Sequence, residues 1–419
     1  MEENRLRLSG EVRLIMKRIA VIGGGASGMM AACQAAQRGH RVILFERQKK
    51  LGRKLLVTGN GRCNITNRGL DVSRYHGHNP SFVQNVLGRF GLEETVAFFE
   101  EAGIPFAEGR DGKLFPSSLQ AQAVQRILEY ELQRRGVEVL LHRRVDAIRP
   151  GKGCWGVITA SQENHSFDSV ILAAGSCAYP QLGASRSGYE LAASLGHTVY
   201  EPFPAIVPIN IPLKILHRLE GIKWDCRLTA AEGSKSLCQS EGELLFTKYG
   251  LSGPVSLDVS RAVNARITEG GRPVLIVDFF PQFSGEELRM TLERLWKDGR
   301  KTAAFSLLGI LKERMPEVLL SVAGIDPAKT VKTLSRNERA QIANSLKALT
   351  LESGSPRSFS EAVVAAGGVD VEEINPASME SKLVENLYLT GELLDIDGDS
   401  GGFNLQFAWS TGALAGMAQ

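Results

Sequence analysis

The sequence predicts an α/β fold that begins with a strand, a glycine-rich turn, a helix and a second strand. Residues 19–22 and 42–45 are short apolar runs typical of buried parallel strands, and residues 28–38 between them form a small-residue helical pattern. Gly39 ends this helix. Strand and glycine patterns of the same kind return in residues 387–402. We therefore expect both ends of the chain to build one discontinuous Rossmann-like domain.

The glycines of the first turn have the spacing of a dinucleotide-binding site. Gly23 permits the tight turn, Gly25 lets the backbone approach a pyrophosphate, and Gly28 lets the helix pack against the strand. The free N–H groups and the dipole at the start of the helix favour the negative charge of phosphates. Glu46 closes the second strand, where a carboxylate can accept hydrogen bonds from the adenosine ribose. The expected contacts to an ADP moiety are Gly23, Gly25, Ala26, Ser27, Gly28, Glu46 and Arg47.

A second contact near the end of the chain favours FAD over NAD as the resident cofactor. A flavoprotein needs a late segment that returns to the ribityl and isoalloxazine groups, and the strand pattern at 387–390 ends in Gly391 and Glu392. Residues 401–405 open the last helix, whose N–H groups can stabilise negative charge at N1 and O2 of reduced flavin. An ordinary strand, turn and helix is the alternative. The expected contacts are Gly391, Glu392, Asp395, Gly401, Gly402, Phe403, Asn404 and Leu405, with Val145, Ala174 and Gly175 from the middle of the chain.

Residues 52–67 are rich in glycine, asparagine, threonine and basic residues and have little periodicity, which predicts a functional loop. Arg53, Lys54 and Arg62 are expected to face phosphate or flavin, with solvated surface charge as the alternative. Cys63 is either a small side chain packed in a tight loop or a thiolate near the flavin. Further cofactor contacts are expected at Thr58, Gly59, Asn60, Gly61 and Asn64.

The remaining patterns follow one another along the chain. Helices are expected at residues 81–102 and 119–135, and strands at 137–141, 155–160 and 170–174. Proline-bounded β runs follow at 205–211, 242–247 and 273–279, a helical stretch at 284–349, β and glycine patterns at 359–369, and a last helix from about residue 405.

A chain of 419 residues exceeds the usual size of one hydrophobic core, so we expect several domains. Residues 1–15 are expected to be a flexible N-terminal extension. The predicted domains are an FAD-binding domain (16–200 and 358–419), an inserted β-rich domain (201–283 and 350–357) and a helical domain (284–349).

Composition excludes several classes of protein. No apolar run approaches the roughly 20 residues of a membrane span, and a formal net charge of +3 is no signature of a nucleic-acid partner. The six cysteines include no C-x-x-C pair, which argues against a zinc ribbon or a vicinal redox disulfide. Residues 1–15 are too charged for a secretory signal, so we expect a cytoplasmic protein with reduced thiols.

Two weaker patterns have simple explanations. His76 and His78 have no cysteine or acid at ligand spacing, so we expect an ordinary loop and no metal site. Residues 336–347 form a basic helix that is interrupted by Glu338 and has no aromatic platform, which predicts a solvated face and no RNA site.

Several separate blocks carry a specific resemblance to a known family. They are residues 52–54, 58–67, 246–247, 250–254, 366–369, 379–382, 391–395 and 401–406. Together with the first glycine turn, they make the chain from Lys17 onward resemble the BaiN/YhiN-like family of FAD-dependent oxidoreductases.

The resemblance implies an FAD domain made from both chain ends, an inserted β-barrel-like domain and a helical domain nested within it. It also implies NAD(P)H-linked flavin chemistry, with reduction of steroid-like enones as one activity of the family. Two residues depart from the family pattern, because Lys248 stands where the family often has His and Ala365 where it often has Thr. Lys248 and Tyr249 are the candidate proton donors, with exposed loop residues as the alternative.

The sequence therefore predicts an FAD-dependent oxidoreductase that passes a hydride through flavin N5 to a small organic acceptor, such as an activated C=C bond, with NAD(P)H as a transient reductant. The alternatives are an amine oxidase that uses oxygen, an FAD-containing RNA-modifying or RNA-binding protein, and a flavin-binding regulator. We expect a small-molecule substrate and neither a nucleic acid nor a membrane as partner. The sequence makes no prediction of oligomeric state.

Overall fold

The computed structural model describes residues 16–419, and its first unit is the predicted strand, helix and strand. These are β1 (Arg18–Ile22), α1 (Ala26–Gln37) and β2 (Arg41–Phe45). β1 and β2 belong to a five-stranded parallel sheet in the order β20-β11-β1-β2-β7, with β7 at Glu138–Leu140, β11 at Ser169–Leu172 and β20 at Leu387–Leu389. Because β20 pairs with β11, both ends of the chain meet in one sheet, which confirms the predicted Rossmann-like α/β fold.

The last helix, α11 (Phe403–Met417), packs directly on α1. A methyl group on Gly412 would lie 2.3 Å from the carbonyl oxygen of Ser27, and one on Gly416 would lie 2.3 Å from that of Ala31. Any side chain at these two positions would therefore push the helices apart. The fully buried indole of Trp409 fills the core on another side of α11.

One predicted helix is wrong, because residues 81–102 form two helices, α2 (Phe82–Leu87) and α3 (Leu92–Glu101). A side chain at Gly91 would meet the carbonyl oxygen of Leu87 at 2.6 Å, and the Gly91 N–H donates to the Glu94 carboxylate, which begins a new helix.

The other elements of this part are β3 (Thr66–Asn67), β4 (Tyr75–His76), β5 (Phe106–Glu108), β6 (Lys113–Pro116), α4 (Ala121–Arg134), β8 (Val145–Pro150), β9 (Trp155–Thr159), β10 (Asn164–Phe167), α5 (Ser187–Ser194), β12 (Val199–Ala205), β19 (Val364–Val369) and β21 (Asp397–Gly398).

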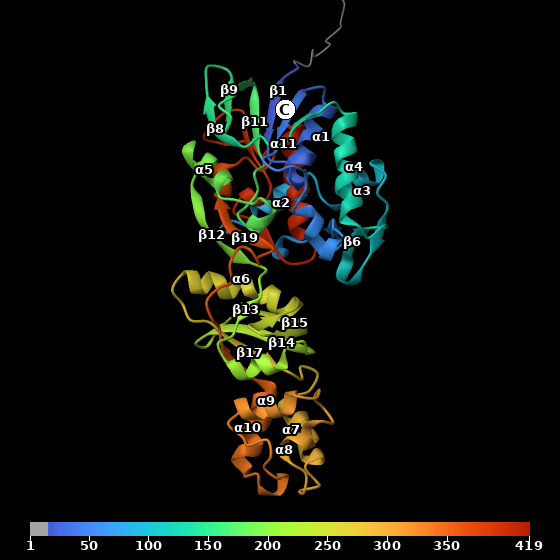
Figure 1. Cartoon of the computed structure of the whole chain (residues 1–419), viewed down its shortest axis with the longest axis vertical. Helices are drawn as coiled ribbons and strands as arrows, with labels where there is room; N and C mark the ends of the chain where they lie inside the picture. Colours follow the sequence, from blue (N-terminus) through green and yellow to red (C-terminus); the bar gives the residue numbers. More distant parts are fainter. Residues whose placement is uncertain (1–15) are drawn as a thin grey trace, which may run out of the picture.

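The middle of the chain forms a six-stranded antiparallel sheet in the order β13-β16-β15-β14-β17-β18. A helix that the sequence interpretation missed, α6 (Pro254–Thr268), lies between this sheet and the parallel sheet (Figure 1). The strand pairing is open, with β13 and β18 as edge strands. One hydrogen bond links the two edges, because Gly354 N–H, just after β18, donates to Asn210 O of β13 at 2.8 Å. The strands are β13 (Ile209–Asn210), β14 (Lys223–Glu232), β15 (Lys235–Thr247), β16 (Gly250–Ser252), β17 (Val274–Asp278) and β18 (Leu349–Glu352).

Four helices occupy the end of the molecule farthest from the parallel sheet (Figure 1). They are α7 (Gly285–Leu295), α8 (Ala303–Leu307), α9 (Met315–Val322) and α10 (Arg336–Lys347). Their buried side chains join those of the six-stranded sheet in one hydrophobic core, separate from the core around α1 and α11. The exact domain boundaries and a closed barrel stay predictions. The predicted extension at residues 1–15 lies outside the described residues, and no helix from residue 16 onward has the length and apolar character to span a membrane.

We predict that Gly412→Ala lowers the free energy of unfolding by about 1–3 kcal/mol, because the added methyl group overpacks the α1–α11 contact. Gly285→Ala is the matched control, since a methyl group at this helical position meets no atom within 4 Å. Thermal unfolding of both variants measures the effect. Equal melting temperatures for the two variants would contradict the packing argument.

Candidate functional site

The three fingerprint glycines each have a different steric environment. Gly23 has a φ of +108°, and a methyl group there would lie 2.3 Å from the carbonyl oxygen of Ala173. A methyl group on Gly28 would lie 1.9 Å from the carbonyl oxygen of Gly23. By contrast, a methyl group on Gly25 would have no atom within 4 Å. Only the middle glycine faces open space, which is the place where a pyrophosphate would approach the backbone.

The start of α1 and the end of β2 complete this part of the site. The first bond within the helix runs from Met29 N–H to Gly25 O at 3.0 Å, so the N–H groups of residues 26–28 precede the helical ladder. Glu46 is half-buried and accepts from Gly24 N–H at 2.8 Å and from Gln48 N–H at 2.7 Å. Each carboxylate oxygen keeps a further lone pair for a ribose hydroxyl. Arg47 is exposed and donates to Ser185.

The carboxyl ends of β11 and β20 bring the next predicted contacts to the same sheet edge. Ala174 lies against Gly23, and a methyl group on Gly175 would meet no atom within 4 Å. Gly391 N–H donates to Thr411 Oγ1 at 2.9 Å, and the Glu392 carboxylate forms an ion pair with Lys54 and accepts from Ala365 N–H. The structure therefore joins the 52–67 loop to the C-terminal segment. Val145 is a buried residue of β8 that pairs with Thr159 of β9, and its predicted cofactor contact stays a prediction.

The 52–67 loop has several residues in the left-handed backbone region, including Gly59, Asn60 and Cys63. Arg53 donates to Gln48, and the Arg62 guanidinium lies 4.9 Å from the centre of the Phe115 ring. Cys63 is fully buried, and burial raises the pKa of its thiol to about 12. A neutral thiol packed in the loop therefore agrees with the structure, and a reactive thiolate at Cys63 does not. Thr58 O accepts from the Cys63 N–H, and Gly61 stays exposed.

Asn64 is the residue of this loop that most needs a partner. Its side-chain oxygen is buried and has no hydrogen bond within residues 16–419. The amide carbon lies 3.2 Å from the position that a methyl group on Gly402 would take. An unsatisfied buried acceptor beside the start of α11 is costly in the free protein, and a ring N–H of a flavin would satisfy it.

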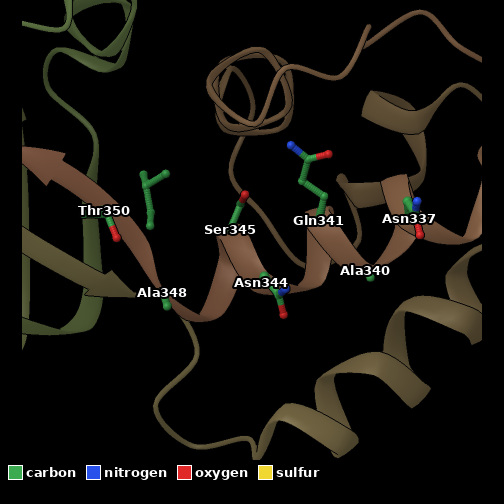
Figure 2. A pocket seen from close by; sticks show the side chains of 8 residues that line it. Asn337, Ala340, Gln341, Asn344, Ser345, Ala348 and Thr350 are labelled. Atoms are coloured by element: carbon green, nitrogen blue, oxygen red, sulfur yellow. The ribbon is translucent and has the colours of Figure 1, made fainter. Parts of the chain in front are cut away.

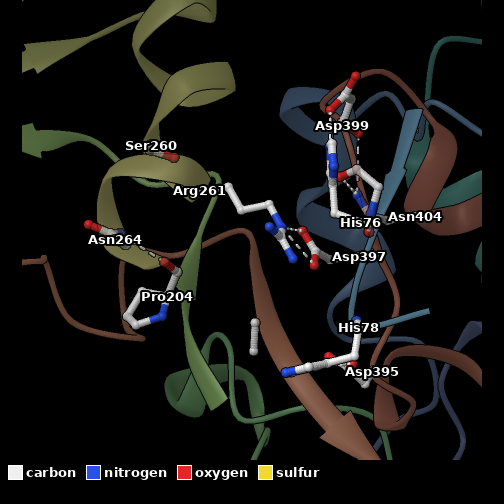
Figure 3. Close-up of polar contacts among 12 residues, drawn as sticks. His76, His78, Pro204, Ser260, Arg261, Asn264, Asp395, Asp397, Asp399 and Asn404 are labelled. Atoms are coloured by element: carbon white, nitrogen blue, oxygen red, sulfur yellow. Dashed lines mark hydrogen bonds and ion pairs between the residues drawn. The ribbon is translucent and has the colours of Figure 1, made fainter. Parts of the chain in front are cut away.

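The segment before α11 carries alternating aspartates, Asp395, Asp397 and Asp399, and Asn404 in the first turn of α11 lies close to them (Figure 3). Asn404 holds the turn, because it accepts from Gly398 N–H at 2.8 Å and donates to Gly398 O at 2.7 Å. Asp395 accepts from the backbone and the ring of His78, and His76 contacts Asp399 at 2.7 Å. No group of three or more metal-ligating side chains occurs in residues 16–419. Around the same turn, Asn67 donates to Gly401 O, Phe403 is buried and Leu405 is half-buried.

The structure also places a residue at this turn that the sequence interpretation missed. Arg261 reaches from α6 to Asp397, and its Nε donates to both carboxylate oxygens, at 3.0 and 2.7 Å (Figure 3). Burial raises the pKa of Asp397, and the Arg261 guanidinium opposes that effect. The two residues lie 136 positions apart in the sequence, so no local pattern signalled their contact.

The two proton-donor candidates lie in the turn between β15 and β16. Lys248 is exposed, and the Arg357 guanidinium lies 3.8 Å from the centre of the Tyr249 ring. Ala365 is buried in β19, directly beside Glu392. Proton donation by Lys248 or Tyr249 stays a prediction.

A groove of about 390 Å³ runs along α10 and the start of β18, far along the chain from the glycine turn (Figure 2). Its polar side chains, which include Asn337, Gln341, Asn344 and Thr350, are uncharged amides and hydroxyls. None of its residues is an acid, a base, a cysteine or a cation, so we assign the chemistry to the sheet edge and not to this groove.

Comparison with known proteins gives one family for nearly the whole chain. The model of the HI0933-like protein Rossmann domain matches residues 17–418. The chain is 38% identical to a 3-dehydro-bile acid delta(4,6)-reductase of Clostridium scindens, over 96% of this chain and 99% of that protein. It is 30% identical to a ribosomal RNA dihydrouridine synthase of Haemophilus influenzae, over 93% of this chain and 95% of that protein.

Solved structures with a similar chain path include two steroid dehydrogenases. The 3-ketosteroid-delta4-(5alpha)-dehydrogenase of Rhodococcus jostii RHA1 is 13% identical, with a TM-score of 0.47 over 98% of each chain. The 3-ketosteroid delta1-dehydrogenase of Sterolibacterium denitrificans is 11% identical, with a TM-score of 0.49 over 96% of this chain and 98% of that chain.

We predict that Gly25→Ala weakens FAD binding about tenfold or more, a loss of about 1.4 kcal/mol, and leaves the stability of the apoprotein nearly unchanged. The added methyl group enters open space in the protein and would collide only with a bound pyrophosphate. Gly28→Ala should destabilise the apoprotein itself, since its methyl group meets Gly23 O. Flavin titration and thermal unfolding of both apoproteins separate these effects. Unchanged FAD affinity in Gly25→Ala would rule out a pyrophosphate at this turn.

The pKa of Cys63 gives a second prediction for the site. At about pH 8, iodoacetamide should modify the exposed Cys154 and leave Cys63 intact, because burial keeps the Cys63 thiol protonated and inaccessible. Peptide mass spectrometry after native labelling measures both positions. Rapid labelling of Cys63 in the folded protein would restore the thiolate interpretation.

Proposed function

The chain belongs to the HI0933-like Rossmann-domain family of flavoprotein oxidoreductases, and from this premise we propose that it reduces a carbon–carbon double bond conjugated to a carbonyl group. The predicted family and the predicted enzyme class, a flavin-dependent oxidoreductase, are confirmed. The observation that carries the proposed reaction is the full-length similarity to a protein named as a delta(4,6)-reductase of a 3-dehydro-bile acid. In such a substrate the double bonds are conjugated to the 3-oxo group.

The residues present fit FAD. Gly25 faces open space at the start of α1, and Glu46 has acceptor capacity for a ribose. Asn64 offers a buried oxygen without a partner beside Gly402, where the pyrimidine end of a flavin would lie under this proposal. When bound, FAD supplies two-electron hydride chemistry between a reductant and the substrate. The chain then has to orient the substrate, exclude water and receive charge on the carbonyl oxygen.

NAD(P)H is the proposed reductant. The sequence has no second strand followed by a G-x-G-x-x-G turn, so the nicotinamide would visit the flavin transiently. The reaction balances as one hydride to the β carbon, which originates from NAD(P)H, and one proton to the α carbon. NAD(P)H is oxidised to NAD(P)⁺ and the double bond becomes a single bond. Lys248 and Tyr249 are retained as candidates for the proton donor.

A second candidate substrate is uracil within RNA, because the chain is 30% identical to a ribosomal RNA dihydrouridine synthase. The C5=C6 bond of uracil is also conjugated to a carbonyl, so the two candidates share their chemistry. The basic side chains of helix α10 do not favour RNA binding, because two of them have partners within the protein. Lys347 is held by the Asp278 carboxylate at 2.7 Å, and the Arg339 guanidinium lies 5.1 Å from the centre of the Trp296 ring. We therefore favour a small conjugated enone.

We predict that NADH or NADPH bleaches the bound flavin under anaerobic conditions and that a 3-oxo-4-ene steroid then restores its colour. The saturated 3-oxo steroid is the matched control, because it has a carbonyl but no conjugated double bond to accept the hydride. Stopped-flow absorbance measures both half-reactions. A flavin that neither nicotinamide reduces would disprove the proposed cycle, whereas reoxidation only by a uridine-containing RNA would favour the second candidate.

A further inference from the structure

Arg261 occupies the junction between the two halves of the molecule. It projects from α6, which packs on the six-stranded sheet, toward the turn that precedes α11 (Figure 3). Its Nε donates to Asp397, a carboxylate that is only 2% exposed. A buried carboxylate holds a guanidinium firmly, because leaving it without its partner is strongly unfavourable.

The pairing leaves the other end of the guanidinium available. Both hydrogen bonds to Asp397 come from Nε, and neither terminal nitrogen of Arg261 has a hydrogen-bond partner within residues 16–419. The side chain is 25% exposed. A guanidinium carries four N–H donors on its two terminal nitrogens, in a planar arrangement suited to an oxygen acceptor.

The surroundings of Arg261 connect it with the predicted flavin contacts. Asp397 precedes Gly398, whose backbone Asn404 holds at the start of α11. On another side, the Arg261 guanidinium lies 5.9 Å from the centre of the Phe203 ring in β12. Phe203 is paired with Ala366 of β19, next to Gly367 and Gly368. The guanidinium thus contacts β12 and β21. β12 in turn pairs with β19, where Ala365 N–H donates to Glu392 at the edge assigned to the cofactor.

We propose that Arg261 binds the substrate through the carbonyl oxygen that is conjugated to the reducible double bond. This inference rests on the proposed function and names the group that would hold the substrate. When hydride reaches the β carbon, negative charge develops on the carbonyl oxygen, and two N–H donors of a fixed guanidinium stabilise it. Asp397 has the supporting role, because it sets the orientation of the guanidinium. Arg261 forms no covalent bond and gives up no proton.

The test compares three variants of the full-length, FAD-loaded protein. Arg261→Lys keeps a positive charge near Asp397 and removes the planar donors. Arg261→Gln with Asp397→Asn removes both charges, so that no buried carboxylate is left unpaired. Arg266→Gln is the matched control, since Arg266 lies on the same helix and pairs with Glu232 and Glu269, which belong to the same part of the chain.

Two measurements are made on each variant. One is titration with 4-chlorophenol, a probe whose phenolate oxygen imitates the charged oxygen of an enolate. Binding of the phenol is followed in the visible spectrum of the oxidised flavin. The other is the kcat/KM for reduction of a 3-oxo-4-ene steroid. Both Arg261 variants should keep their flavin and their rate of reduction by nicotinamide within about twofold of the unmodified protein. Their affinity for the phenol should fall about tenfold or more, and kcat/KM about 100-fold. The Arg266 variant should behave like the unmodified protein.

Three results are decisive. Unchanged phenol affinity in both Arg261 variants would overturn the inference. Loss of FAD from both Arg261 variants, with retention by Arg266→Gln, would also overturn it, because Arg261 would then serve the cofactor or the domain contact. If the unmodified protein is not reduced by nicotinamide, the proposed function fails separately. The phenol titration needs neither nicotinamide nor steroid, so it still decides the role of Arg261.

Discussion

The fold depends on backbone contacts so close that only glycine leaves room for them. Gly28 brings the start of α1 against the Gly23 turn, and Gly412 and Gly416 bring α11 against Ser27 and Ala31. Each contact advances by four residues on both helices, so α1 and α11 run together in the same direction. α11 begins at the Gly401–Gly402 turn. Its packing on α1 therefore fixes the position of the proposed flavin contact relative to the start of α1, where phosphate would bind.

The second constraint is electrostatic and joins the two halves of the molecule. Burial disfavours the charged form of Asp397, and the Arg261 guanidinium favours it. The position of α6 beside the β21 turn therefore favours the charged form of this carboxylate. His76 and His78 hold Asp399 and Asp395 on either side of Asp397. The position of the inserted sheet and the shape of the turn before α11 are thus linked through one short segment.

The sequence predicted those parts of the site that depend on short local patterns. The glycine turn between β1 and β2 and the pairing of both chain ends in one sheet follow from a few adjacent residues each. The cofactor contacts at Glu46 and Gly391 rest on similar local patterns and stay predictions. The helix α6 was missed because Val255, Val259 and Val263 are β-branched and stand among proline-bounded β runs, although their spacing of four residues suits a helix. Arg261 was missed for a different reason. Its importance comes from Asp397, which only the folded chain brings near.

The proposed division of the site is compatible with a family that includes proteins named for a bile acid and for ribosomal RNA. The proposed cofactor edge is built from the two ends of the chain, whereas Arg261 belongs to the inserted middle part. A carbonyl conjugated to a double bond is common to a steroid enone and to uracil, so one guanidinium at the junction suits either. The two substrates differ in the size and shape of the groups that surround this carbonyl. Selectivity between substrates should therefore arise from the side chains of α6 and β12 that line the junction, and not from the residues proposed to bind FAD.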